Sequence, residues 1–135
     1  MSGERIVEPA AALVSAAAWR ERGERVAWIL GECDLLNAGH ARAVAAARRG
    51  ADRLIVAVRN DEAAAKALGE GRPVLPAAER ARLVAALRGV DRVVIADEAA
   101  AARLSASLGQ PEIGTSGAVR VAVARVLARH GRGGA

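Results

Sequence analysis

Apolar residues form three short continuous runs along the chain, and segments with a helical pattern separate these runs. The apolar runs are Val26–Leu30, Leu54–Val58 and Val93–Ala96. A strand that is apolar at every position is typical of a sheet covered on both faces. The predicted helices are Pro9–Arg22, Ala38–Arg49, Glu62–Leu68, Ala77–Arg88 and Glu98–Leu108. This alternation predicts an α/β fold: a three-layer, Rossmann-like parallel sheet with helices on both faces.

The length of 135 residues fits one domain, 1–135, because a chain of this size has room for a single hydrophobic core. We expect an N-terminal helix within 1–24, a core at 25–98 and a C-terminal basic amphipathic helix at 114–130. In that last helix the apolar face comprises Val119, Val123, Val126 and Leu127, and the basic face comprises Arg125, Arg129 and Arg132.

The formal net charge of +5 is concentrated at the C-terminal end of the chain. Residues 120–135 contain four arginines and no acid, so residues 1–119 carry a net charge of only +1. A basic chain invites a nucleic-acid partner, but such partners are commonly held by stacking on aromatic side chains. The only Phe, Tyr or Trp residues are Trp19 and Trp28, so nucleic acid is the least favoured partner. That function would predict binding that weakens steeply with salt.

The cysteine content and the apolar segments of the chain indicate in which cellular compartment the protein is expected. Cys33 is the only cysteine, which excludes an internal disulfide and a cysteine-cluster metal site. No apolar run approaches the roughly 20 residues needed to span a bilayer. The first residues lack the basic and apolar regions of a signal peptide, so we expect a cytoplasmic protein that is not bound to a membrane.

The loop after the first predicted strand carries the main candidate chemistry, because parallel α/β sheets bind ligands beyond the carboxyl ends of their strands, at the switch in strand order. It reads Gly31-Glu32-Cys33-Asp34-Leu35-Leu36-Asn37-Ala38-Gly39-His40. Gly39 lets a phosphate approach the start of the next helix, where free N–H groups favour anions. His40 could hydrogen-bond that phosphate and neutralise charge that develops during phosphoryl transfer. The simpler interpretation is a helix N-cap at Asn37 and a solvated His40.

The order of motifs from Ala18 to Glu98 is more specific than this loop alone. The first predicted strand is followed by Gly-x-x-Asp-Leu-Leu-Asn-Ala-Gly-His-Ala-Arg and a helix. Four further motifs then come in this order: Gly-Ala-Asp-Arg-Leu-Ile-Val-Ala-Val-Arg-Asn-Asp, Gly-Glu-Gly-Arg-Pro, Ala-Ala-Glu-Arg and Gly-Val-Asp-Arg-Val-Val. This order resembles the cytidylyltransferase-like nucleotidyltransferases, and most of all their heptose-1-phosphate adenylyltransferase domain, which makes ADP-heptose. Since family members have five strands, the resemblance implies a shortened version of their fold.

The resemblance implies transfer of AMP or CMP from a nucleoside triphosphate to a sugar or polyol phosphate, with Mg²⁺ assisting and pyrophosphate leaving. The family's His-x-Gly-His motif falls on 37–40, which implies catalytic roles for His40 and Asn37. The implied nucleotide- and phosphate-binding residues are Gly31, Asp34, Gly39, Arg72, Arg80, Thr115 and Ser116. The implied acceptor-binding residues are Asn60 and Asp61. The resemblance implies no side chain as a metal ligand. Guanidinium groups suit phosphate because they stay charged and offer paired donors. Arg72 and Arg80 can equally be surface residues of an Arg-rich chain.

Several positions depart from the family pattern. Asn37 replaces the first histidine of the signature, and an amide has no proton to give. Cys33 replaces an aromatic residue, Glu32 adds a carboxylate that would repel phosphates, and Leu68 replaces a lysine. The fourth and fifth strands have no clear counterpart. Thr115 and Ser116 either remain from the motif that opens the family's last helix or simply cap the helix that follows.

Two functional classes therefore stay open. The first is an active nucleotidyltransferase, which family and motif order favour. The alternative is a catalytically impaired member that binds a nucleotide, a sugar phosphate or a protein partner. The missing strands would also leave one sheet edge exposed, which predicts a homo-oligomer, most simply a homodimer. A monomeric mass at micromolar concentration would contradict that prediction.

Overall fold

The computed structural model describes residues 5–111, and these residues contain a parallel three-stranded sheet. The strands are β1 (Val26–Gly31), β2 (Arg53–Arg59) and β3 (Arg92–Ala96), in the order β1-β2-β3. Gly31 pairs with Val58 in register, and Arg59 pairs with Ala96, so the carboxyl ends of all three strands lie at one edge. This edge positions every loop of the candidate site.

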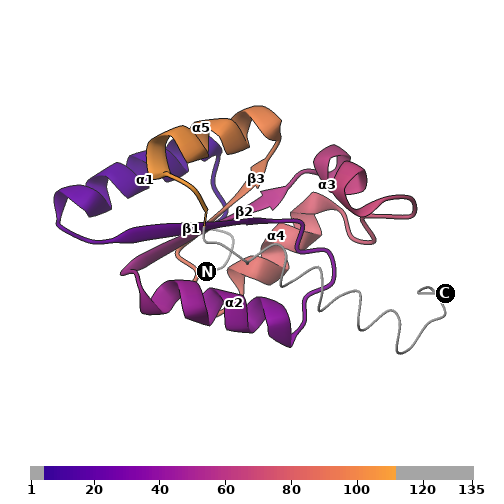
Figure 1. Cartoon of the computed structure of the whole chain (residues 1–135), viewed down its shortest axis with the longest axis horizontal. Helices are drawn as coiled ribbons and strands as arrows, with labels where there is room; N and C mark the ends of the chain where they lie inside the picture. The colour runs from indigo at the N-terminus through magenta and orange to yellow at the C-terminus, as the bar shows by residue number, and fades with distance from the viewer. Residues whose placement is uncertain (1–4, 112–135) are drawn as a thin grey trace.

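Helices cover both faces of the sheet, which confirms the predicted fold class (Figure 1). On one face lie α1 (Pro9–Glu21) and α5 (Glu98–Leu108), and on the other lie α2 (Ala38–Arg49) and α4 (Ala77–Ala85). The short helix α3 (Asp61–Leu68) follows the carboxyl end of β2 directly. The alternation of apolar strands with helical segments was thus sufficient to predict three layers.

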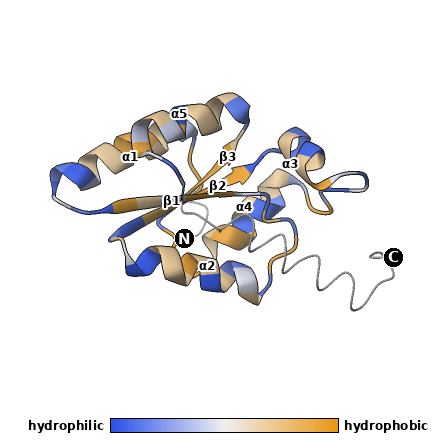
Figure 2. Ribbon diagram, in the orientation of Figure 1, coloured by the Kyte–Doolittle hydropathy of each residue, from blue (hydrophilic) through white to orange (hydrophobic). Residues whose placement is uncertain are grey.

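The two hydrophobic clusters are built mainly from aliphatic strand residues and helix alanines. Ile55, Ala57 and Val94 pack against α1 and α5, whereas Leu54, Val56, Val58 and Val93 pack against α2 and α4. Figure 2 shows the apolar strands between helices that carry both apolar and polar residues. Ala12 and Ala16 are buried one turn apart on α1, where their small side chains allow the helix to lie close to the sheet. Trp28 is buried and donates its indole N–H to the carbonyl of Gly109 at 2.8 Å.

The predicted elements of the described region are confirmed, and every boundary but one agrees to within one residue. Helix α4 ends at Ala85 and not at Arg88, because the chain turns toward Gly89, which has a φ of +95°. Within residues 5–111, β1 pairs only with β2, and the strand order does not reverse, so the expected switch point is not found there. The helix expected at 114–130, with Thr115 and Ser116, lies outside the described residues. None of the described helices is long and apolar enough to cross a bilayer.

Candidate functional site

Asn37 sets the start of α2 through both ends of its side-chain amide. Its Oδ1 accepts the N–H of Gly39 at 2.7 Å, and its Nδ2 donates to the carbonyl of Leu35 at 3.2 Å. The residue itself is extended, with a φ of −151°, as an N-cap requires. The amide is therefore already engaged, and Asn37 acts here as the cap of the helix that carries His40.

His40 lies in the first turn of α2 and is 4% exposed. Its Nδ1 accepts the backbone N–H of Asn37 at 3.2 Å, so in the neutral ring the proton is on Nε2. Nε2 is buried and has no hydrogen-bond partner among the described residues. Burial lowers the pKa of His40, although the nearby Glu32 carboxylate acts in the opposite direction. His40 is thus a neutral N–H donor that has no acceptor within residues 5–111, and it is not the solvated side chain of the simpler interpretation.

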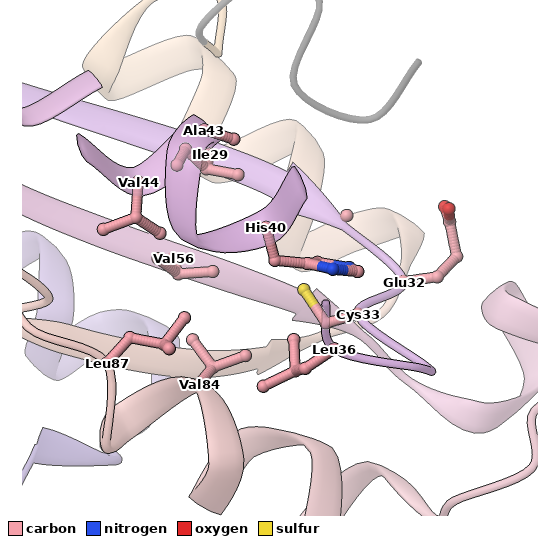
Figure 3. A pocket seen from close by; sticks show the side chains of 11 residues that line it. Ile29, Glu32, Cys33, Leu36, His40, Ala43, Val44, Val56, Val84 and Leu87 are labelled. Atoms are coloured by element: carbon pink, nitrogen blue, oxygen red, sulfur yellow. The ribbon is translucent and has the colours of Figure 1, made fainter. Parts of the chain in front are cut away.

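The imidazole lines a cavity of about 20 Å³, which is room for about one water molecule. The cavity lies between β1, α2 and α4, and its other lining residues are mostly aliphatic. Figure 3 shows the ring extending from α2 toward Glu32 and Cys33 in the loop after β1. Cys33 has a φ of +55°, unusual for a residue other than glycine, and burial raises the pKa of its thiol to about 12. Cys33 therefore shapes this loop and is not a nucleophile at neutral pH.

Asp34 joins the loop after β1 to the segment 72–75. The two carboxylate oxygens of Asp34 accept the backbone N–H of Val74 at 2.7 and 2.9 Å, and one of them accepts the N–H of Leu75 at 2.9 Å. The carboxylate also pairs with Arg72 Nε at 2.6 Å. The Asp34 side chain is 1% exposed. Burial acts to raise its pKa, but the hydrogen bonds from Leu75, Val74 and Arg72 outweigh burial and lower it. Arg72 is thereby held through Nε, and its Nη groups have no acceptor within residues 5–111.

Replacing Asp34 by asparagine should weaken the fold in a pH-dependent way. Because the folded-state pKa of Asp34 lies below its ordinary value of 3.8, its ionised form stabilises the fold above that value, and this stabilisation is lost as the pH falls through the folded-state pKa. We expect Asp34→Asn to lower the free energy of unfolding by about 1–3 kcal/mol at pH 7 and by less at pH 3. Urea denaturation at both pH values measures this difference. An equal loss at both would contradict the role of the Asp34 charge.

Arg80 is completely buried, and its guanidinium binds the loops that follow β1 and β2. Nη1 donates to the carbonyls of Glu32 (2.6 Å) and Arg59 (2.8 Å), and Nε donates to the carbonyl of Leu75 at 2.9 Å. Nη2 pairs with Asp61 Oδ1 at 2.7 Å. Arg80 therefore supplies donors to four groups that come from three separate loops. The structure thus does not place Arg80 among surface arginines, and all of its engaged donors hold protein atoms.

The two predicted acceptor-binding residues lie at the start of α3. Asn60 is the N-cap and accepts the N–H of Ala63 at 2.9 Å. Asp61 Oδ1 accepts the N–H of Ala77, at the start of α4, and the Arg80 guanidinium. The Asp61 side chain is 56% exposed, and no described residue donates to its Oδ2. Of the pair, Asp61 keeps the larger capacity to contact a small ligand.

Sequence reasoning missed Arg59, the last residue of β2. Its Nε lies 2.9 Å from Oε2 of Glu32, which is buried, and its Nη1 lies 3.6 Å from Oε1 of Glu98, which is exposed. The contact with Glu32 is an ion pair without hydrogen-bond alignment, because Arg59 Nε is buried and has no hydrogen-bond partner within residues 5–111. The available signal was its position directly after the second predicted strand, at the edge where ligands are expected. The charge that Glu32 brings to this edge is therefore balanced by Arg59.

The described residues thus bring a buried neutral donor, a tethered arginine and a Glu–Arg pair to the carboxyl edge of the sheet. A family model described as cytidylyltransferase-like matches residues 28–128, which covers the entire edge. The chain belongs to the cytidylyltransferase-like family. The match begins in β1 and continues past the described residues.

Curated relatives agree with this family. Bifunctional protein HldE of Gluconacetobacter diazotrophicus is 44% identical over 89 residues, which are 66% of this chain and 18% of that protein. Bifunctional protein HldE of Proteus mirabilis is 41% identical over 107 residues, covering 79% of this chain and 23% of the relative. The chain therefore spans less than a quarter of the length of these relatives.

A solved structure supports the fold of this cytidylyltransferase-like chain independently. It is the crystal structure of the lipopolysaccharide core biosynthesis protein from Thermoplasma volcanium, which superposes with a TM-score of 0.56 at 23% identity. The superposition covers 63% of this chain and 68% of that one. At this identity the likeness shows a shared fold only.

Proposed function

We propose that this protein is a nucleotidyltransferase that transfers AMP or CMP from a nucleoside triphosphate to a sugar or polyol phosphate. The observation that carries the proposal is the buried His40 Nε2–H group, which has no acceptor among the described residues and faces the loop where the family binds phosphate. Membership of the family supports nucleotidyl transfer in general, and the resemblance to the heptose-1-phosphate adenylyltransferase domain favours ATP and a sugar phosphate.

In this reaction an oxygen of the acceptor phosphate attacks the α-phosphorus of the nucleotide. The bond from that phosphorus to the bridging oxygen breaks, and pyrophosphate leaves with the electron pair. His40 Nε2 donates to a phosphate oxygen whose negative charge grows in the transition state. Arg72, tethered by Asp34, presents its Nη groups to the polyphosphate. The protein thus positions groups and neutralises charge, and no covalent intermediate is needed.

Mg²⁺ enters this proposal as part of the nucleotide substrate. The described residues contain no group of three or more His, Cys, Asp or Glu side chains that could hold a metal ion. Asp34 is engaged by backbone N–H groups and Arg72, and Asp61 by Ala77 and Arg80. Since Mg²⁺ is commonly held by substrate phosphates with few protein ligands, the residues present fit an ion carried in by the triphosphate.

The remaining site assignments extend the same proposal. Gly31 and Gly39 bring backbone close to the phosphates, and Asp61 with Asn60 faces the acceptor. Thr115 and Ser116 would contact phosphate from outside the described residues. Arg80 would act on the nucleotide through the loops that it holds, since its engaged donors bind protein atoms.

A second candidate is a catalytically impaired protein that binds a nucleotide or sugar phosphate without turnover. The engagement of Asn37 favours it, because an amide that caps α2 through Oδ1 and binds Leu35 through Nδ2 replaces the first histidine of the family motif. In this case the protein would act as a binding or protein-interaction module. The fold and the position of His40 are compatible with both candidates, so they do not distinguish the two.

A pyrophosphate-release assay with ATP and CTP, each paired with several sugar and polyol phosphates, separates the candidates. Calorimetric titration with the same nucleotides runs in parallel. Pyrophosphate release that depends on an acceptor supports the transferase. Binding without release, with release gained in Asn37→His, supports the impaired protein. Absence of both binding and release would overturn the transferase and the nucleotide-binding protein, and would leave only a protein-interaction module.

We also propose that the protein works in the cytoplasm as a homo-oligomer. Within residues 5–111 the outer edge of β1 has no partner strand, and such edges are commonly paired or covered. Light scattering at micromolar concentration measures the mass, and a monomer would count against this part of the proposal.

A further inference from the structure

Two buried side-chain nitrogens among the described residues have no hydrogen-bond partner, and both lie beside Glu32. They are Nε2 of His40 and Nε of Arg59. Glu32 lines the same cavity as His40, and its Oε2 is 2.9 Å from Arg59 Nε. Glu32 directly follows Gly31 at the end of β1, and Arg59 ends the neighbouring strand, so the carboxylate has a cationic and a neutral donor group close to it.

We propose that Arg59 is a further phosphate-binding residue and that Glu32 competes with the nucleotide for it. This inference rests on the proposed function and adds to it a residue that sets nucleotide affinity. The carboxylate of Glu32 holds the guanidinium in the absence of ligand. A triphosphate bound at His40 draws the guanidinium away, because it carries more negative charge than one carboxylate.

The geometry of the pair supports this exchange. The Arg59–Glu32 contact lacks hydrogen-bond alignment, so turning toward a phosphate breaks no aligned hydrogen bond at Nε. The Arg59 side chain is 22% exposed, which leaves it access to a ligand at the edge of the sheet. Arg80 Nη1 holds the backbone carbonyls of both residues, at 2.6 Å for Glu32 and 2.8 Å for Arg59, so the difference lies in the side chains, and that of Glu32 is only 4% exposed. The arginine is therefore the partner with access to a ligand.

Glu32→Gln tests the proposal, since glutamine keeps the size of the side chain and removes the charge. Calorimetric titration with ATP, CTP and inorganic pyrophosphate should show binding tighter by about tenfold than in the unsubstituted protein. The gain should shrink at 1 M salt, where charges are screened over about 3 Å. In Glu32→Gln combined with Arg59→Gln the gain should disappear.

Glu98→Gln is the matched control. Glu98 pairs with the same guanidinium at 3.6 Å, but its side chain is 74% exposed. Because solvent screens this exposed contact, we expect its removal to change nucleotide affinity by less than about twofold.

Unchanged or weaker binding in Glu32→Gln, with normal binding in the unsubstituted protein, would overturn the inference and leave the proposed function intact. No binding by any of these proteins would instead overturn the proposed function. Should Glu32→Gln fail to fold, judged by thermal unfolding, Arg59→Gln alone decides. We expect Arg59→Gln to weaken nucleotide binding by about tenfold, and unchanged binding in this variant would again overturn the inference.

Discussion

Replacing Arg80 by methionine should lower the free energy of unfolding by about 3–5 kcal/mol. The guanidinium is completely buried and holds the carbonyls of Glu32, Arg59 and Leu75. Methionine fills similar space but offers these acceptors no donor, and each buried group that is left unsatisfied costs about 1–3 kcal/mol. Since a domain of this size is stable by only about 5–15 kcal/mol, the change removes a large part of the total. Urea denaturation measures it.

Arg82→Met is the matched control on the same helix. The Arg82 side chain is 68% exposed, and among the residues that the structure describes it pairs only with Glu79 on its own helix, at 3.1 Å. Exposed pairs of this kind contribute about 0–1 kcal/mol, so the control should differ little from the unsubstituted protein. A loss below about 1 kcal/mol in Arg80→Met would show that the carbonyls find water or other donors, and would contradict the structural role given to Arg80.

The layers of this fold could be predicted from sequence because each strand is apolar throughout and each helix has a clear start or stop. Asn60 and Asp97 cap α3 and α5, and Gly109 follows α5 with a φ of +86°. Local signals of this kind act within a few residues, so they can be recognised in the sequence without knowledge of tertiary contacts. The exception is the end of α4, where the helical pattern continues to Arg88 although the helix stops at Ala85.

The site was only partly predictable, because its side-chain roles depend on contacts between distant segments. Asp34 and Arg72 are 38 positions apart, and Arg80 reaches Glu32 across 48. No spacing rule distinguishes a buried arginine that binds carbonyls from an exposed one that binds phosphate. The pairing of Arg59 with Glu32 depends on strand register, which the sequence does not specify residue by residue.

Replacing His40 by alanine should lower kcat for pyrophosphate release by about 10²–10³, the usual cost of losing one preorganised donor to a developing negative charge. Nε2 is buried and already oriented, because Nδ1 is fixed by the N–H of Asn37. The pyrophosphate-release assay measures the loss for the best nucleotide and acceptor. Thermal unfolding must accompany it, since His40 also takes part in the capping of α2, which is worth about 1 kcal/mol.

Two controls separate the donor from the rest of the side chain. His40→Gln keeps an N–H donor at a similar reach and should recover part of the lost rate. His130→Ala changes the chain's other histidine and should leave the rate unchanged. Equal rates in His40→Ala and the unsubstituted protein would remove His40 from the mechanism, and with it the observation on which the proposed function depends.

The pH dependence then decides which form of His40 is active. Because burial lowers its pKa, the ring is neutral at pH 7 and above, and its Nε2–H donor persists as the pH rises. A neutral donor therefore predicts that kcat has no basic limb attributable to His40 between pH 7 and pH 9. The imidazolium would be required instead if kcat fell with rising pH around a pKa near or above 7 and this fall were absent in His40→Gln. That result would mean that a bound phosphate overcomes the desolvation of His40 and raises its pKa, so the profile measures the electrostatics of the loaded site directly.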